Sequence, residues 1–149
     1  MKFSKAEESF DFREVYRVDI HKTMFLTIQL DDPRSIYQQV ADGIKQLIAH
    51  GDLAEGTPLP PVRQLAADLG VNLNTIATAY RELQKEGLIV VKHGSGSVVA
   101  RRTPTPRTQV ELFTPLRTAL TQFVLAGWTR DSILEVVSKE LEFAQGRKK

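Results

Sequence analysis

Apolar side chains recur at two different spacings along this chain, and the changes in spacing divide it into elements. Residues 24–30 alternate between apolar and polar, which predicts a strand. Residues 36–48 then carry apolar side chains at steps of three and four, which predicts a helix. A shorter helical stretch over Val62–Leu69 is closed by Gly70, a residue that suits the end of a helix.

A third helical pattern begins two residues after Gly70, with Asn72 as its capping residue and Gly87 at its end. Its apolar side chains fall on one face of the helix, and we expect them to lie in the core: Ile76, Ala79, Tyr80 and Leu83. Two short strands follow, over 88–92 and 97–100. The intervening His93, Gly94, Ser95 and Gly96 form the tip of a hairpin, because glycine permits positive φ.

The two ends of the chain differ in pattern from this middle part. Residues 1–25 have no sustained period, and we interpret them as a tail that either lacks fixed structure or precedes a natural start at Met24. One short helix around 13–19 is expected within it. Residues 103–108 are rich in Pro and Thr and form a linker. Residues 109–146 then repeat a helical pattern twice, around a break at Gly127.

Composition narrows the class of protein. With 42% hydrophobic and 26% charged residues in 149, the chain is expected to fold, and no apolar run is long enough to span a membrane. The absence of Cys excludes disulfides and thiolate sites, and three scattered His make a metal site improbable. No secretory signal is visible. We therefore expect a cytoplasmic protein with no cofactor, no metal and no contact with a membrane.

The net charge of the chain does not indicate a nucleic-acid partner. The whole chain has a formal charge of +2, and residues 26–102 contain as many acidic as basic side chains. A basic domain attracts DNA at long range, but this one is neutral in bulk. Any prediction of DNA binding therefore depends on local geometry.

That geometry is present between Val62 and Ala100. A short helix, a tight turn at Gly70 and a second, capped helix make a helix-turn-helix, whose second helix presents its N-terminal end to a major groove. The hairpin directly after this helix makes the unit winged. The fold class that we predict is mainly α with a small β-wing: a winged helix-turn-helix domain over 26–102, followed by a short helical tail.

Several fixed-spacing motifs resemble the GntR family of bacterial transcription regulators. The similar stretches are SIYQQV over 35–40, GDLAEGTPLPPVRQLA over 51–66, NTIATAYREL over 74–83, EGL over 86–88 and GSG over 94–96. The resemblance is continuous over about half of the chain. It implies a dimeric regulator that binds double-stranded DNA.

The length of the tail narrows the resemblance to the YtrA-like subfamily. Other branches of the family append a large ligand-binding or aminotransferase-like domain, and the residues after Thr103 are too few for either. In YtrA-like proteins such a tail serves dimerisation, so the resemblance implies a homodimer. The apolar residues at helical spacing that we assign to this role are Leu116, Leu120, Phe123, Val124, Ile133, Val137 and Leu141.

The resemblance also assigns the DNA-contacting positions. The Arg of the second helix is matched by Arg63, the start of the recognition helix by Asn72, Leu73, Asn74 and Thr75, and the wing tip by His93, Gly94, Ser95 and Gly96. Thr78 and Arg81 continue the outward face. Many family members carry a long donor where this chain has Leu73, and many have Arg where it has Ala77. Both differences remove groups that pair with guanine, and Leu73 then suits contact with a thymine methyl.

Each of these positions also has a plainer interpretation. Arg63 and Arg81 are side chains of a kind that is usually solvated, and His93 suits an ordinary exposed hairpin. Asn72 fits a helix cap better than a base reader, and Asn74 is the better candidate for contact with adenine. The GSG at the wing lacks the Lys and the following helix of a phosphate-binding loop.

Two classes of function remain. The first is a sequence-specific DNA-binding repressor that recognises an inverted repeat as a dimer. The second is a protein-interaction module that uses a winged helix as its scaffold and does not bind DNA. The neutral bulk charge favours the second, whereas Arg63, Asn74, Thr75 and the wing favour the first. No catalytic motif occurs, so we do not expect an enzyme. The operator, the regulated genes and any effector ligand are not readable.

Overall fold

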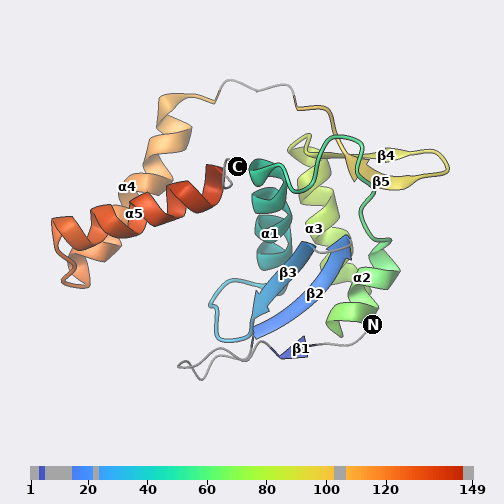
Figure 1. The fold of residues 1–149 in the computed structure, drawn as a ribbon, viewed down its shortest axis with the longest axis horizontal. Helices are drawn as coiled ribbons and strands as arrows, with labels where there is room; N and C mark the ends of the chain where they lie inside the picture. The colour runs from blue at the N-terminus through green and yellow to red at the C-terminus, as the bar shows by residue number, and fades with distance from the viewer. Residues whose placement is uncertain (1–3, 6–14, 22–23, 103–106, 146–149) are drawn as a thin grey trace. The chain divides into compact units, whose positions relative to one another are not determined.

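A computed structural model describes residues 4–5, 15–21, 24–102 and 107–145, which fall into two compact units, Met1–Arg102 and Thr103–Lys149. The elements of the first unit in chain order are β1 (Ser4–Lys5), β2 (Val15–His21), β3 (Met24–Gln29), α1 (Ile36–His50), α2 (Val62–Leu69), α3 (Leu73–Lys85), β4 (Ile89–Lys92) and β5 (Gly96–Val99). The second unit contains α4 (Gln109–Leu125) and α5 (Arg130–Gln145) (Figure 1). The fold is mainly helical with a small two-stranded wing, as the sequence predicts.

The N-terminal segment corrects one prediction. The short helix expected around 13–19 is wrong where the segment is described, because β2 is a strand that pairs antiparallel with β3 from Val15 opposite Gln29 onward. Strand β1 extends the sheet on the other side of β2. The sequence was misread because the pairing partner of β2 is what makes it a strand, and local spacing does not reveal that partner. Residues 1–3, 6–14 and 22–23 of the expected tail lie outside the described residues.

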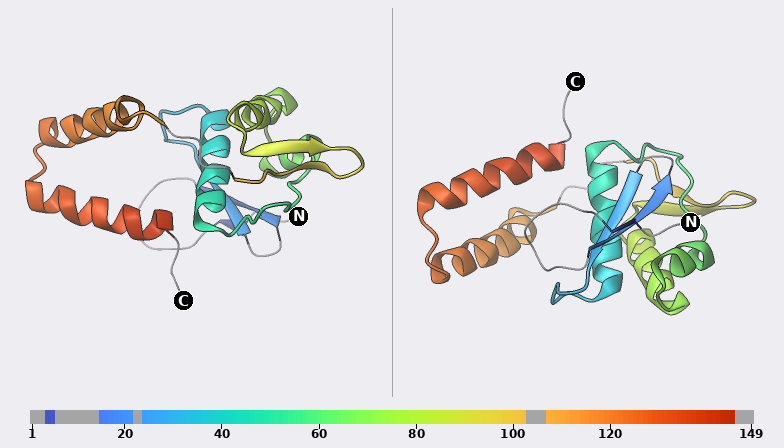
Figure 2. Two further views of the ribbon diagram at one scale, coloured as in Figure 1. Left: turned by 90° about the horizontal axis from the view of Figure 1, so that it is seen from above. Right: turned by 60° about the horizontal axis from the view of Figure 1, so that its bottom comes forward.

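The core of the first unit lies where α1 meets β3 and α3 (Figures 1 and 2). Leu26 from β3, Ile44 from α1 and Leu83 from α3 are at most 1% exposed. Gly43 permits this contact, since a Cβ at that position would lie 2.3 Å from Leu26 Cδ1. A glycine inside a helix costs about 1 kcal/mol relative to alanine. Its presence in α1 is therefore explained by the close approach of β3.

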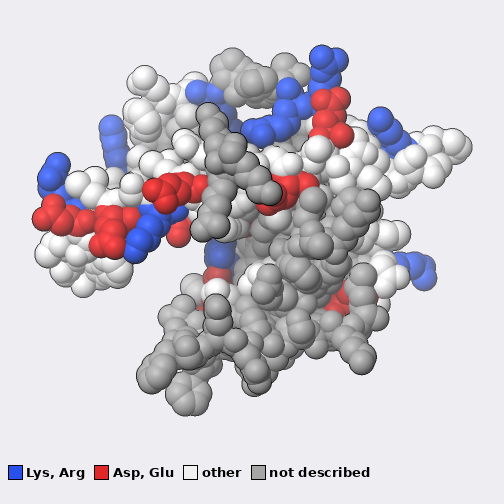
Figure 3. Space-filling view, viewed as in Figure 1, with Lys and Arg blue, Asp and Glu red and all other residues white. Residues whose placement is uncertain are grey.

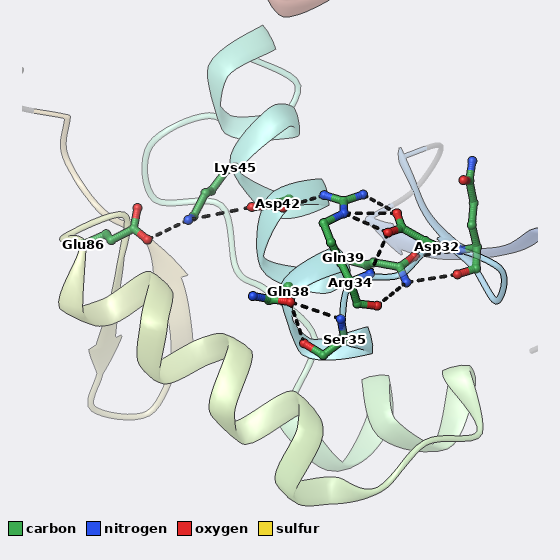
Figure 4. A network of polar contacts seen from close by, with 9 residues as sticks. Asp32, Arg34, Ser35, Gln38, Gln39, Asp42, Lys45 and Glu86 are labelled. Atoms are coloured by element: carbon green, nitrogen blue, oxygen red, sulfur yellow. Dashed lines mark hydrogen bonds and ion pairs between the residues drawn. The ribbon is translucent and has the colours of Figure 1, made fainter. Parts of the chain in front are cut away.

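A single buried polar side chain joins β3 to α1 in the described part of this unit. Gln39 Oε1 accepts the Gln29 backbone N–H at 2.8 Å, and Gln39 Nε2 donates to the Gln29 carbonyl at 3.0 Å (Figure 4). Nε2 also lies 3.3 Å from the Arg34 carbonyl, to which it donates. The amide thus satisfies backbone groups at the end of the strand, which is what a buried polar group requires.

The wing is broader than a hairpin. Strands β4 and β5 pair antiparallel, with Ile89 opposite Val99. The chain before α2 joins them on the β5 side: Leu59 N–H donates to the Ser97 carbonyl at 2.8 Å, and Val99 N–H donates to the Thr57 carbonyl at 2.9 Å. The Pro-rich connection between α1 and α2 therefore anchors the wing to the start of α2.

The second unit consists of two capped helices. At α4, the backbone N–H and the hydroxyl of Thr108 both donate to Glu111 Oε2 at 2.8 Å. These two bonds lower the pKa of Glu111 below its usual value. At α5, Thr129 Oγ1 accepts the Ser132 N–H at 3.3 Å, so Thr129 caps the helix. α4 contains no buried side chain, and α5 buries only Ile133. No helix in the described part of the chain is long and apolar enough to cross a membrane.

Candidate nucleic-acid interface

The turn between α2 and α3 is built by three residues. Gly70 adopts φ 64°, a left-handed conformation that glycine enters without steric cost. Its N–H donates to the Ala67 carbonyl at 3.2 Å, and the Val71 N–H donates to the Ala66 carbonyl at 3.0 Å. These bonds satisfy carbonyls that the end of a helix leaves without partners. The chain then turns directly into α3, so the two helices pack against each other.

Asn72 caps α3, as its sequence position indicates. Its Oδ1 accepts the Asn74 backbone N–H at 2.8 Å, and the residue itself is extended with φ −63° and ψ 138°. The side-chain oxygen is therefore occupied by the helix. Asn72 serves first as a structural residue that fixes where α3 begins.

The inner face of α3 is buried in the core. Ile76, Ala79 and Leu83 have no exposed surface, and Tyr80 is 4% exposed. Tyr80 Oη donates to the Pro60 carbonyl at 2.6 Å, and burial raises the pKa of its phenol above the usual range. This bond joins α3 to the connection ahead of α2. The orientation of α3 is thus set from inside, which leaves its other face for a ligand.

The outer face of α3 carries the remaining residues predicted to contact DNA. Leu73 is 43% exposed, and Asn74 and Arg81 are also exposed. Thr75 and Thr78 are half-buried. Within the described residues the Asn74 side chain makes no hydrogen bond, so both its carbonyl and its amide group are available.

Thr78 and Arg81 are connected to the helix itself. Thr78 Oγ1 donates to the backbone carbonyl of Asn74 at 2.8 Å, one helical turn back. Arg81 Nη2 donates to the same Oγ1 at 3.0 Å. The hydroxyl proton of Thr78 is thereby used, and the guanidinium of Arg81 lies along the helix toward Thr78.

Arg63 lies in the first turn of α2 and is exposed. Over the described part of the chain its guanidinium has no hydrogen-bond or ion-pair partner. The neighbouring Gln64 is different, since its Nε2 donates to Asp68 Oδ1 at 2.8 Å. Arg63 therefore keeps all five N–H donors for a partner outside the protein.

The wing tip consists of exposed residues between the paired Lys92 and Gly96. Gly94 and Gly96 have φ of 79° and 67°, and the Ser95 N–H donates to the Lys92 carbonyl at 3.0 Å. The protruding end of the wing is uncharged in Figure 3. Lys92 is exposed beside this tip, and its side chain forms no hydrogen bond or ion pair with another described residue. Lys92 was not among the predicted contact residues, although a basic residue directly before a hairpin tip is a visible signal.

Two basic side chains of the first unit, Arg34 and Lys45, are paired with acidic residues. Arg34 Nη1 lies 2.7 Å from Asp42 Oδ2, and Lys45 Nζ lies 2.6 Å from Glu86 Oε1 at the end of α3 (Figure 4). The guanidinium of Arg34 also lowers the pKa of Asp32 through hydrogen bonds. Such exposed pairs contribute about 0–1 kcal/mol each. Four basic side chains in the described part of the first unit have no hydrogen-bond or ion-pair partner: Arg63, Lys85, Lys92 and Arg101. Of these, Arg63 lies on α2 and Lys92 lies beside the wing tip.

The fold and this site define a winged helix-turn-helix protein. The family model described as bacterial regulatory proteins, gntR family, matches residues 36–99, which run from the start of α1 to the end of β5. The HTH-type transcriptional repressor YtrA of Bacillus subtilis is 31% identical over 125 residues, covering 79% of this chain and 95% of the relative.

Two solved structures agree with this assignment. YtrA from Sulfolobus acidocaldarius, a GntR-family transcription factor, is 38% identical with a TM-score of 0.55, and the match covers 64% of this chain and 97% of that one. A structure titled transcriptional antiterminator from Listeria monocytogenes EGD-e is 27% identical with a TM-score of 0.71, covering 80% and 91%. The chain belongs to the gntR family and groups with its YtrA-like members. It is a DNA-binding transcription regulator and not an enzyme.

Proposed function

We propose that this protein is a transcriptional repressor that binds an inverted-repeat operator as a homodimer. The observation that carries the proposal is a set of unpaired polar groups on two packed helices: the guanidinium of Arg63 on α2 and the side-chain amide of Asn74 on α3. Both are exposed beside a turn that fixes how the helices cross. In a helix-turn-helix protein the N-terminal end of the second helix enters the major groove.

Each predicted contact residue has a role in this proposal. Arg63 donates to guanine or to a phosphate beside the recognition helix, and Asn74 pairs with adenine. Asn72 and Thr75 fix and flank the helix start, while Leu73 faces the bases. Arg81 reaches a phosphate by leaving Thr78. Lys92, with His93, Gly94, Ser95 and Gly96 of the wing tip, follows the adjacent minor groove or its phosphates.

The dimer is proposed from the second unit. Ten of the fourteen exposed large apolar side chains of the described residues lie in α4, α5 and the turn between them. Two helices of this length are marginal alone in water, so they need a partner surface. A second copy of the chain offers the same apolar surface, and a two-fold axis lets identical faces cover each other.

The seven residues assigned to the dimer are exposed to different extents. Leu116, Val124 and Leu141 are 49%, 64% and 53% exposed, whereas Leu120, Phe123 and Val137 are half-buried. Ile133 is 8% exposed and is already covered. We therefore expect Leu116, Val124 and Leu141 to lose most surface on dimerisation, with Ile133 supporting α5 from within.

Repression follows from this arrangement because a dimer seated across a promoter excludes polymerase. A protein that acts on promoter DNA works in the cytoplasm, where a bacterial chromosome lies. The named repressor among the relatives supports the sign of regulation. The proposal assigns no effector ligand.

The alternative is a winged protein-interaction module without DNA binding. The equal number of acidic and basic residues over 26–102 favours it. Titration of the full-length protein against DNA from its own promoter, at several salt concentrations, separates the two. Each phosphate contact contributes about −0.9 to the slope of log affinity against log salt, so the proposal predicts a steep fall. Binding that is absent, or equal for promoter and random DNA, would favour the interaction module.

A further inference from the structure

The outward side chains of α3 fall into two rows along the helix. Leu73 and Ala77 are four residues apart and form one row, and Asn74, Thr78 and Arg81 form the neighbouring row. The first row has no hydrogen-bonding atom in its side chains. Leu73 is 43% exposed and begins the helix, so its apolar surface is the first that a major groove would meet.

The second row is less polar in practice than its sequence suggests. Thr78 has one hydroxyl proton, and that proton is donated to the backbone carbonyl of Asn74 at 2.8 Å. The same oxygen accepts Arg81 Nη2 at 3.0 Å. While these bonds stand, the group that Thr78 offers to a base edge is its methyl group. The bond to Thr78 holds the guanidinium of Arg81 along the surface of α3.

Asn74 is then the one exposed polar side chain on the first two turns of α3, among the described residues, because Thr75 and Thr78 are half-buried. The side-chain carbonyl of Asn72 already accepts the Asn74 backbone N–H, the bond that caps the helix. A free carboxamide donates and accepts side by side, and this pattern matches N7 and N6 of adenine. The exposed start of α3 therefore combines one adenine-matching amide with apolar surface.

Apolar surface in a major groove has one chemical complement. The C5 methyl of thymine is the apolar group that base pairs present there, whereas guanine and cytosine present O6, N7 and N4. Leu73 and Ala77 against a G·C pair would remove water from these polar atoms without replacing it, which is unfavourable. Against thymine the same side chains bury a methyl group.

We propose that α3 reads A·T base pairs, with Asn74 on adenine and Leu73, Ala77 and the Thr78 methyl against thymine, and that guanine recognition is left to Arg63 on α2. This inference rests on the proposed function, since it concerns the operator of that same site. It predicts an operator half-site whose pairs under α3 are A·T and whose G·C pair lies beside α2.

The test begins with selection of binding sites from random duplexes by the full-length protein. Each thymine of the selected site is then replaced singly by deoxyuridine, which lacks only the C5 methyl. At a thymine that meets Leu73 we expect affinity to fall about fourfold, the factor for about 0.8 kcal/mol per buried methylene-sized group. The Leu73→Ala variant should no longer distinguish the two bases there. Leu30→Ala is the matched control, because Leu30 is 53% exposed outside α3, and it should retain the difference.

A second variant tests the same assignment by gain of function. Leu73→Arg adds a donor that pairs with guanine, so sites selected by this variant should change from an A·T to a G·C pair at the position that deoxyuridine identified. Unchanged selected sites would overturn the assignment. So would G·C pairs under α3 in the parent site, or indifference to deoxyuridine at every thymine.

Failure of the inference is distinguishable from failure of the proposed function. If the full-length protein enriches no sequence, sequence-specific binding itself is wrong, and the inference falls with it. If a site is enriched and Arg63→Ala weakens it, but the site lacks these A·T contacts, DNA binding stands and only the readout by α3 is wrong.

Discussion

The two units of this chain differ in how much of their apolar surface is buried. Of the nineteen buried apolar residues among those that the structure describes, eighteen lie in the unit up to Arg102, and Ile133 alone lies in α4 or α5. The first unit closes its core from β3, α1, α2, α3 and the wing. The second leaves Leu112, Val124 and Leu125 more than half exposed. The first unit therefore has a closed core, whereas the second leaves apolar surface that the proposed dimer would cover.

This difference predicts that equal truncations have unequal effects. Leu83→Ala removes a fully buried side chain from α3 and should lower the free energy of unfolding by about 2–5 kcal/mol. Leu112→Ala is the matched control in α4, where the side chain is 53% exposed, and it should leave unfolding of the first unit unchanged. Urea denaturation followed by circular dichroism compares them. Equal midpoints for the two variants would break the contrast between the units.

The next effect concerns DNA and not folding. Arg63→Ala removes a guanidinium without described partners, so affinity for the selected operator should fall by about 1–3 kcal/mol with no change in thermal stability. Fluorescence anisotropy with labelled operator measures it. Arg101→Ala, an exposed arginine after the wing, is the control and should bind as the parent does. An Arg63→Ala protein of undiminished affinity would remove α2 from the interface.

The smallest effect separates two neighbouring asparagines. Asn72→Ala removes the cap of α3 and should cost about 1 kcal/mol of stability. Asn74→Ala should leave stability unchanged, since its side chain has no partner in the described residues, and should weaken operator binding instead. Thermal melts and anisotropy on both variants make the comparison. A stability loss at Asn74, or none at Asn72, would contradict the roles given to these residues.

How far the sequence predicts this molecule depends on how local each signal is. The helix start at Asn72, the left-handed Gly70 and the glycines of the wing are set by their own conformational preferences, and all are confirmed. The strand β2 was misread because its pairing with β3 makes it a strand, and the spacing of its own residues does not reveal that partner. The bond between Leu59 and Ser97 was also unforeseen, since a Pro-rich segment shows no strand period.

The candidate site was predictable in its positions but not in its chemistry. Spacing and family resemblance identified Thr78 and Arg81 as outward residues, and the structure agrees that Arg81 is exposed. Only the coordinates reveal that Thr78 Oγ1 bonds to the Asn74 carbonyl and to Arg81. Such bonds depend on rotamers, which sequence spacing does not fix. They leave the methyl group of Thr78, and not its hydroxyl proton, as the group that this residue offers to a base.

Light scattering of two proteins at tens of micromolar tests the contrast between the units most directly: the full-length chain of 16.7 kDa, and a chain that ends at Pro106. The account predicts a full-length dimer of about twice that mass, because a second copy would cover the exposed apolar side chains of α4 and α5. It predicts a folded monomer for the shortened chain, which should bind a half-site weakly. A full-length protein that stays monomeric, or a shortened chain that stays dimeric, would contradict it.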